Sequence, residues 1–309
     1  MGSRIFLAMD SEKDLWSNFR ESVMQRFEEW EQSLSRFRST SELSEVNRHS
    51  GQWQQVSDTF WQVLTLALQV EQETQGIITP AVLDALEAAG YTINFEDLGN
   101  TADRWLRQPL PTLANVREIE LDESNHAINL PHGLRLDFGG VAKGWAVHQT
   151  MLILREYAPV LVDGGGDIAV SGPMQDGSAW PIGITDPMNA SANLGLVMIS
   201  SGGVATSGRD YRRWQVNGHW QHHLIDPRTQ KPADTDVLAA TVIAASVMDA
   251  EKHSKQCLIL GSSETQRLDS PKDIAFLLVL EDGRTIESNN FDQFRWKESC
   301  KATHDKITV

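Results

Sequence analysis

Hydrophobic residues recur every three or four positions in the first third of the chain, a spacing typical of helices with one buried face. The longest stripe predicts a helix that is capped by Ser11 and packs against the core. A second helix is expected over residues 58–75, between a cap at Ser57 and a stop at Gly76. The members of the long stripe are Leu15, Phe19, Val23, Phe27, Trp30 and Leu34.

Three further segments have helical patterns. A short helix is expected near residues 81–89, directly after a proline. Residues 141–156 follow a pair of glycines and are mostly apolar. The last helix is expected over residues 247–260, with Ser246 as its cap and Gly261 at its end.

Strand patterns dominate beyond residue 115, where short apolar runs and alternating segments are bounded by turn residues. Hairpins are expected over residues 116–131 and 274–288, the latter with an Asp-Gly turn. Residues 35–51 are polar and irregular, which predicts a loop or a broken helix. Helices early and strands later predict an α+β fold around one core. Single strands are expected at residues 4–9, 134–138, 159–163, 168–172, 180–187, 194–200 and 238–246.

Composition narrows the class of protein. The chain has 309 residues, of which 40% are hydrophobic, and a formal net charge of -15. This charge argues against a broad nucleic-acid surface, although a local basic pocket could still hold a small anion. The two cysteines form neither a metal motif nor a disulfide framework. No membrane span or leader is recognisable, so the expected location is cytoplasmic, or extracytoplasmic if a leader precedes this sequence. We expect one domain over residues 1–296 and a tail over 297–309.

Two glycine-rich turns are the first candidates for chemistry. "LDFGGVAKG" places Asp137, Gly139, Gly140 and Lys143 between a strand and a helix, and "VDGGGDIAVSG" covers residues 162–172. Glycines let the backbone approach an anion, and a helix N-terminus adds a favourable dipole. Ordinary turns are the alternative. Neither turn fits the dinucleotide fingerprint or the P-loop, which disfavours a hydride-transferring dehydrogenase and a P-loop enzyme.

A second cluster joins cationic and titratable residues. "ATSGRDYRRW" at residues 205–214 offers three arginines as phosphate donors, and "HHLIDPRTQKP" begins at residue 222. The adjacent His222 and His223 with Asp226 place an acid–base candidate near a carboxylate. The simpler interpretation of two adjacent histidines is a strand with one ring inside and the other outside.

Taken in order, these segments resemble the FAD:protein FMN transferases, a family described through thiamine-biosynthesis lipoproteins. The resemblance runs from Met1 to about residue 290 and is carried by eight segments in the expected order. It implies a single mixed α/β domain with helices packed on mixed sheets and FAD in a central cleft. FMN would pass from FAD to a serine or threonine hydroxyl of an acceptor flavoprotein with an Asp-x-x-(Ser/Thr)-Gly-Ala-(Ser/Thr)-like motif, and AMP would leave. The segments are "MGS", "SRFRSTSELSEVN", "LDFGGVAKG", "VDGGGDIAVSG", "WPIGITDP", "VATSGRDYRRW", "HHLIDPRTQKP" and "TVIAAS…AEKHSKQCLILG".

The resemblance also implies roles for single residues. Phe37 replaces a usual tyrosine, so ring stacking is kept and a hydroxyl is lost, and "GIITP" at 76–80 replaces a segment that often carries an acid. His223 is the expected base, and the carbonyl of Gly140 is an expected metal ligand. The implied FAD contacts are Met1, Phe37, Ile77, Ile78, Thr79, Asp137, Lys143, Ser207 and Ile225.

The last helix departs from the family pattern. The family places Asp and Thr four residues apart as magnesium ligands, and this chain has Glu251 and Lys255 there. Residues i and i+4 share one helical face. Our hypothesis is that the Lys255 ammonium takes the place of the ion, pairs with Glu251 and faces the pyrophosphate. An exposed ion pair is one alternative, and a transition-metal site at Asp249 and His253 is another.

This departure leaves three functions open. The first is FMN transfer, in which His223, Lys255 and Glu251 are catalytic and Gly140 and Glu251 are candidate magnesium ligands. The second is an FAD-binding or flavin-carrying protein without transfer chemistry. The third is an FAD pyrophosphatase that gives FMN and AMP, with water in place of the acceptor hydroxyl.

Overall fold

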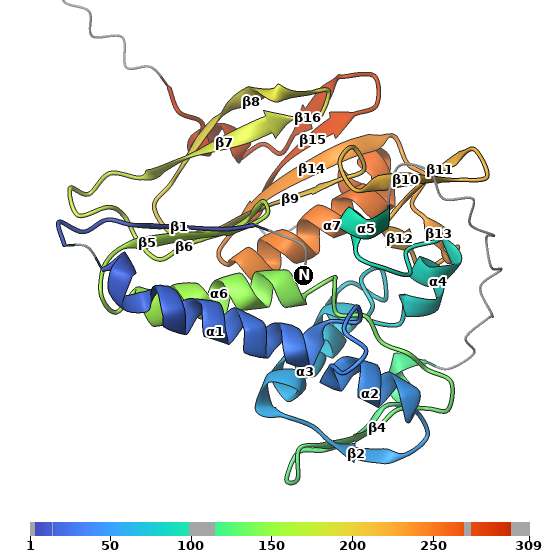
Figure 1. The fold of residues 1–309 in the computed structure, drawn as a ribbon. Coiled ribbons are helices and arrows are strands. Elements are labelled where there is room, and N and C mark those ends of the chain that lie inside the picture. The colour runs from blue at the N-terminus through green and yellow to red at the C-terminus, as the bar shows by residue number, and fades with distance from the viewer. Residues whose placement is uncertain (1–3, 14, 99–114, 269–272, 298–309) are drawn as a thin grey trace, which may run out of the picture.

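The computed structural model describes residues 4–13, 15–98, 115–268 and 273–297 (Figure 1). Within them, none of the helices combines the length and hydropathy of a membrane span. The predicted tail and the contact of Met1 lie outside the described residues, apart from residue 297. The helices are α1 (Trp16–Leu34), α2 (Glu42–Arg48), α3 (Asp58–Glu73), α4 (Leu83–Ala88), α5 (Phe95–Leu98), α6 (Ala142–Leu154), α7 (Val247–Thr265), and the 3₁₀ turns η1 (Val116–Glu118) and η2 (Phe291–Phe294).

The described part of the chain forms a seven-stranded sheet in the order β1-β5-β6-β9-β14-β15-β16, and every neighbouring pair in it is antiparallel. Its strands are β1 (Ile5–Met9), β5 (Val160–Gly164), β6 (Asp167–Val170), β9 (Gly202–Gly208), β14 (Val237–Ala244), β15 (Ala275–Leu280) and β16 (Thr285–Glu287). Smaller sheets are formed by β2 (Trp53–Gln55), β4 (Ala127–Asn129) and β3 (Glu120–Asp122), by β7 (Trp180–Asp186) and β8 (Asn189–Ile199), by β10 (Arg213–Val216) and β11 (His219–His222), and by β12 (Ile225–Asp226) and β13 (Lys231–Pro232).

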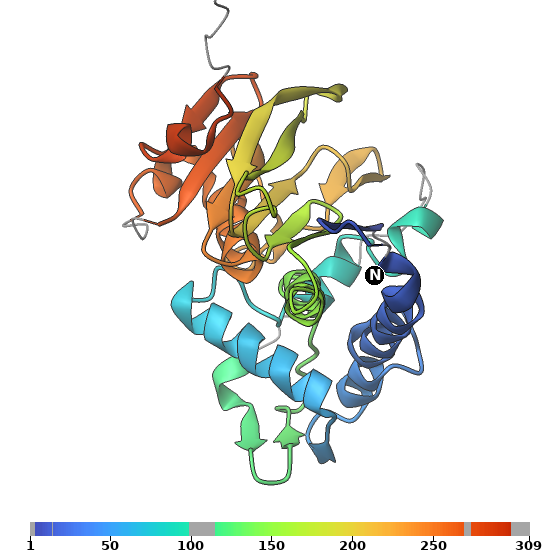
Figure 2. The same cartoon turned by 90° about the vertical axis from the view of Figure 1, so that its left-hand side faces the viewer.

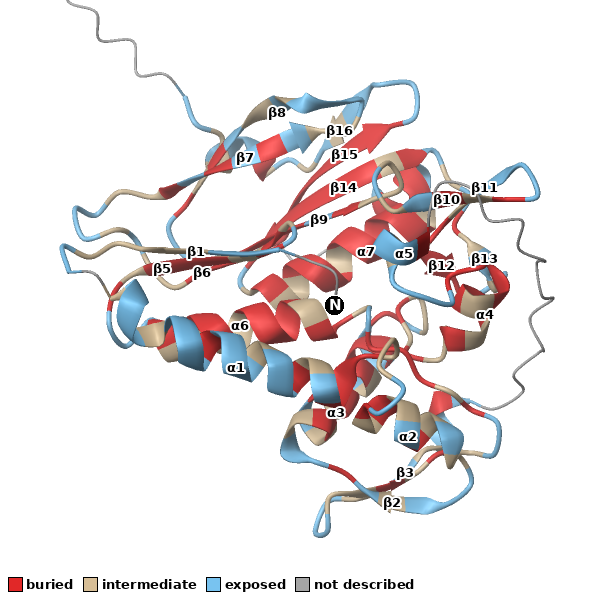
Figure 3. Cartoon of the chain, in the orientation of Figure 1, coloured by how far each residue is buried: buried red, intermediate tan, exposed pale blue. Residues whose placement is uncertain are grey.

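The large sheet is covered on both faces. Helices α6 and α7 lie against one face, with α1 and α3 beyond them, and the β7–β8 hairpin covers the other (Figures 1 and 2). Figure 3 shows the central strands β14 and β15 almost wholly buried, which explains why their sequences are continuous apolar runs. This packing fixes α6 and α7 side by side, and these two helices carry Lys143, Glu251 and Lys255 of the predicted site.

Many predicted elements are confirmed. Ser57 caps α3 by accepting a hydrogen bond from the amide of Phe60, and Ser246 caps α7 through the amide of Asp249. The Asp-Gly hairpin joins β15 to β16. The polar segment after α1 contains the short helix α2, which the broken-helix alternative anticipated.

Two local predictions are wrong. Helix α1 begins at Trp16 and has no side-chain cap, because the Ser11 hydroxyl bonds instead to the amide of Lys13. Residues 134–138 form no strand. The side chain of Asn47 bonds to both the amide and the carbonyl of Leu136, at 2.7 and 2.8 Å, and so replaces a neighbouring strand.

The predicted end of the last helix at Gly261 is confirmed as a break. Gly261 adopts a non-helical backbone with a φ of 81°, which interrupts α7 before a short continuation to Thr265. Glycine suits this position because it adopts a positive φ without strain.

Strand β9 packs closely against the start of α7, the helix that carries Glu251 and Lys255. A Cβ added to Gly203 would lie 2.2 Å from the backbone nitrogen of Val247. We predict that Gly203→Ala lowers the free energy of unfolding by about 1–3 kcal/mol, as overpacking typically does. The measurement is urea unfolding followed by circular dichroism.

Gly172→Ala is the matched control, because a Cβ there meets no atom within 4 Å. It should leave stability unchanged or raise it slightly by restricting the unfolded chain. Equal effects of the two substitutions would contradict the close packing of β9 against α7.

Candidate functional site

Helices α6 and α7 lie side by side (Figure 1), and the first turns of α6 meet the part of α7 that carries Glu251 and Lys255. The amide of Gly144 donates a 3.0 Å hydrogen bond to Oε2 of Glu251. A Cβ at residue 144 would lie 2.5 Å from that oxygen, so the helices approach this closely only because glycine stands there. The glycine in "AKG" is therefore explained by a contact within the protein.

The second oxygen of Glu251 binds the ammonium of Lys255 at 2.7 Å. Their side chains are only 2% and 10% exposed, so the alternative of a solvent-exposed ion pair is wrong. Burial raises the pKa of Glu251, and the charge of Lys255 offsets only part of this effect. The shared helical face that the i,i+4 spacing predicts is confirmed.

Lys143 lies in the first turn of α6 and forms an ion pair with Asp167 at the start of β6. Burial acts to lower the pKa of Lys143, but the charges of Asp167 and Glu251 overcome it and raise the pKa above its ordinary value. The ammonium is therefore charged at neutral pH. Asp167 was missed at the sequence level, and its one signal is its position directly after the turn "GGG".

Asp137 is predicted to bind polar atoms of FAD, and the structure shows which partners its carboxylate has within the chain. One oxygen accepts the amide of Gly139 at 2.8 Å, and the other accepts Nε of Arg36 at 2.8 Å. The carboxylate thus fixes the Gly139–Gly140 turn and one arginine at the same time. Its contact with FAD stays a prediction.

Phe37 and Ile225 meet in one apolar cluster despite being far apart in the sequence. Ile225 is buried with Tyr91 and Trp214, and Phe37 packs against them with its ring centroid 5.4 Å from that of Tyr91. The guanidinium of Arg36 lies 4.0 Å from the centroid of Phe37. Tyr91 and Arg36 were not singled out from the sequence. Tyr91 lies in none of the eight segments, and Arg36 lies in "SRFRSTSELSEVN", where only Phe37 was assigned a role.

Residues 77–79 lie beside the glycine turn, as the resemblance implies. A Cβ at Gly140 would be 3.6 Å from the Ile78 side chain, which is buried, whereas Ile77 and Thr79 are partly exposed. The Thr79 hydroxyl accepts a hydrogen bond from the amide of Ala81.

Ser207 lies on β9 and contacts α7. Its hydroxyl lies 2.9 Å from that of Ser254, which donates to the backbone carbonyl of Glu251. Ser207 is buried in β9, so its observed role is to support the turn of α7 that carries Glu251 and Lys255.

The two adjacent histidines have different surroundings. His222 is buried, with Nε2 at 3.0 Å from the carbonyl of Ala233 and Nδ1 accepting the amide of Leu224. His223 is partly buried, and its Nδ1 is shielded from solvent without a hydrogen-bond partner among the described residues.

The pKa of His223 lies well below its ordinary value, mainly through burial and then through the positive charges of Arg212, Lys143 and Lys255. The imidazole is therefore neutral at neutral pH, with one of its two ring nitrogens free to accept a proton.

The rival metal site at Asp249 and His253 is wrong. Asp249 accepts hydrogen bonds from Ser246 and Lys252, and His253 bonds to Gln256. In the described ranges, no three acidic, histidine or cysteine side chains are arranged to hold a metal ion.

Magnesium does not fit the contacts at Glu251. Both carboxylate oxygens already have donors, and one donor is an ammonium, which repels a divalent cation. The assignment of Gly140 and Glu251 as metal ligands stays a prediction, which the chelation experiment below tests.

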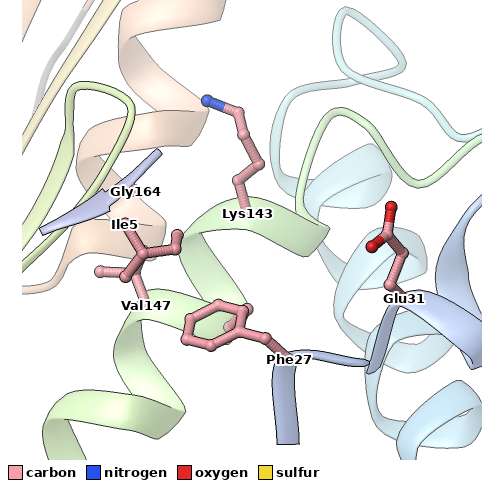
Figure 4. A pocket seen from close by; sticks show the side chains of 7 residues that line it. Ile5, Phe27, Glu31, Lys143, Val147 and Gly164 are labelled. Atoms are coloured by element: carbon pink, nitrogen blue, oxygen red, sulfur yellow. The ribbon is translucent and has the colours of Figure 1, made fainter. Parts of the chain in front are cut away.

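A pocket of about 130 Å³ opens beside Lys143, between β1, α1 and α6. Figure 4 shows the Lys143 side chain extending from α6, with Phe27 and Val147 nearby and Glu31 on the adjacent helix. Ligand pockets usually measure roughly 300–1,000 Å³, so this one is too small for a whole dinucleotide. Its lining residues are Ile5, Phe27, Glu31, Lys143, Ala146, Val147 and Gly164.

The fold is that of a known class of protein. The ApbE protein of Thermotoga maritima has a crystal structure that matches this chain with a TM-score of 0.83 and 27% identity, over 96% of this chain and 97% of that one. The model of the ApbE family matches residues 1–278, and the chain belongs to this family.

Two relatives are named FAD:protein FMN transferase. The one from Treponema pallidum is 28% identical over 260 residues, which cover 78% of this chain and 71% of the relative. The one from Salmonella typhimurium is 26% identical over 282 residues, covering 85% and 77% respectively.

The surroundings of His222 predict how stability depends on pH. Burial lowers its pKa to about 4 from 6.5, so between these values the unfolded chain binds a proton that the folded chain does not. Stability is then complete above pH 6.5 and falls as the pH drops toward 4, by about 3 kcal/mol from this residue. Chemical unfolding across this range measures the loss.

His222→Gln should make this dependence less steep by the share that comes from this residue. The remaining slope comes from His223, His253 and His148, whose pKa values are also lowered by burial. His219→Gln, on the exposed part of the same strand, is the matched control and should keep the wild-type slope. An unchanged slope in His222→Gln would contradict the buried neutral ring.

Proposed function

We propose that this chain transfers FMN from FAD to a serine or threonine hydroxyl of an acceptor protein and releases AMP. Family membership and the two named relatives support this activity. Within the site, the observation that carries it is His223, whose Nδ1 is buried without a hydrogen-bond partner among the described residues and whose pKa is lowered by burial and by the charges of Arg212, Lys143 and Lys255.

The proposed step is a displacement at phosphorus. The acceptor oxygen bonds to the phosphorus on the FMN side of the pyrophosphate, and the bond from that phosphorus to the bridging oxygen breaks. The bridging oxygen leaves with AMP, and the hydroxyl proton goes to Nδ1 of His223. Burial and the nearby positive charges keep this imidazole neutral before the reaction begins, and they also make it a weaker base than an ordinary histidine.

The remaining residues bind and orient. Lys143 and Lys255 supply fixed positive charge for the pyrophosphate, while Phe37 and Ile225 provide an apolar surface for a ring system. The glycine turn held by Asp137 lets the backbone approach the phosphates. The acceptor is expected to carry an Asp-x-x-(Ser/Thr)-Gly-Ala-(Ser/Thr)-like motif.

We infer that the Lys255 ammonium replaces the magnesium ion of the family. Its support is the 2.7 Å pair with a buried carboxylate whose other oxygen is also occupied. One fixed monovalent charge polarises a phosphate less than a directly coordinated divalent ion, so transfer should be slow. The same contacts favour a second function, FAD binding without transfer.

The first prediction concerns metal dependence. We incubate the protein with FAD and a purified acceptor domain, in magnesium or in EDTA, and follow flavin fluorescence of the acceptor band in a gel. Labelling should be equal in both conditions, because no step uses a divalent ion. The double variant Glu251→Asp, Lys255→Thr should label only in magnesium.

Loss of wild-type labelling in EDTA would contradict the hypothesis that Lys255 replaces magnesium. The transfer reaction itself would still be supported by the labelling in magnesium. If the protein binds FAD but labels no acceptor in either condition, it is an FAD-binding or flavin-carrying protein without transfer chemistry. Release of free FMN and AMP without labelling would establish the pyrophosphatase.

The second prediction concerns the base. His223→Gln should lower the rate of labelling by about 10²–10⁴-fold, the usual contribution of general acid–base catalysis. FAD affinity should stay near wild type, because Nδ1 acts on the acceptor proton. His219→Gln is the control, and a matching loss of FAD binding in His223→Gln would assign that ring a binding role instead.

A further inference from the structure

We propose that Arg36 contacts the bound dinucleotide directly, with its Nη2 donating a hydrogen bond to an oxygen of FAD. This inference rests on the proposed function, since it presumes that FAD binds here. It assigns a ligand contact to a residue outside the glycine turns and the histidine pair.

The guanidinium of Arg36 is held in a fixed place. Its Nε binds Asp137 at 2.8 Å, and its Nη1 donates to the carbonyl of Tyr91 at 2.8 Å. The central carbon lies 4.0 Å from the ring centroid of Phe37 and 4.5 Å from that of Tyr91. The side chain is 6% exposed, so its direction is set by the protein.

The remaining nitrogen of the Arg36 guanidinium is Nη2. It is buried and has no hydrogen-bond partner among the residues that the structure describes. A buried donor left unpaired is costly, especially on a charged group, and such atoms are rare in folded proteins. A ligand acceptor at this position would remove that cost.

The chemistry of the site narrows the acceptor to an oxygen. A guanidinium offers hydrogen-bond donors only, in a rigid planar fork, so its partner must accept. Because Asp137 already balances the charge of Arg36, the free donor suits a ring carbonyl as well as a phosphate oxygen. Asp137, which pairs with Nε of Arg36, also accepts the amide of Gly139, so the guanidinium lies beside the glycine turn that is proposed to approach the phosphates.

The test compares the binding of FAD, riboflavin and ADP to wild type, Arg36→Met and Arg36→Lys by fluorescence and calorimetry. Arg36→Lys keeps a positive charge near Asp137 but lacks the planar set of N–H donors that a guanidinium offers. Both variants should weaken FAD binding by roughly 10- to 100-fold, the value of a hydrogen bond from a charged group. Arg38→Met, on an exposed arginine bound by Glu28 and Glu31, is the control and should bind like wild type.

Comparing riboflavin with ADP distinguishes the loss of one ligand contact from a general disruption of the binding site. Weakened riboflavin with unchanged ADP places the contact on the flavin, and the reverse places it on a phosphate; both outcomes support the proposal. Unchanged FAD binding, or an equal loss for both fragments, overturns it. Should Arg36→Met fail to fold, Arg36→Lys decides.

A second measurement needs no substitution. In protein labelled with ¹⁵N-arginine, the Arg36 Nη signals should shift when FAD is added. Unshifted signals in FAD-saturated protein would overturn the proposal. Wild type that binds no FAD would instead contradict the proposed function, and this is visible before any variant is made.

Discussion

The site depends on a carboxylate that has almost no access to water. Glu251 is 1% exposed, and its two oxygens are satisfied by an amide of α6 and an ammonium of its own helix. A buried charge of this kind persists only when it is paired and hydrogen-bonded. The contact therefore fixes the position of α7 against α6, and Gly144 is the residue that lets the two helices come close enough.

Such a pair is a weak source of stability. Desolvating two charges often costs as much as their attraction returns, and an apolar pair of similar volume would frequently serve as well. What the pair supplies is an ammonium held in a set place near Lys143 and His223. Lys143 with Asp167 repeats this arrangement, so two cations and two carboxylates balance before any ligand brings its own negative charge.

The sequence predicted those features that depend on local spacing. The i,i+4 positions of Glu251 and Lys255 placed them on one face, and the serine caps at residues 57 and 246 are local hydrogen bonds. It failed where a distant partner decides the outcome. Asn47 replaces the strand expected beside Leu136, and Arg36 takes an oxygen of Asp137 from 101 residues away (137 minus 36). The spacing of hydrophobic residues carries no information about contacts between residues far apart in the sequence, so these contacts can be seen only in the folded structure.

The central claim is that an amine, and no divalent ion, lies at the pyrophosphate. The most direct measurement is ³¹P NMR of FAD bound to excess protein, with Mn²⁺ added as a paramagnetic probe. The account predicts phosphate signals that keep their width in wild type and broaden in the variant with aspartate at 251 and threonine at 255. Strong broadening in wild type would place a metal ion at the phosphates and contradict the account.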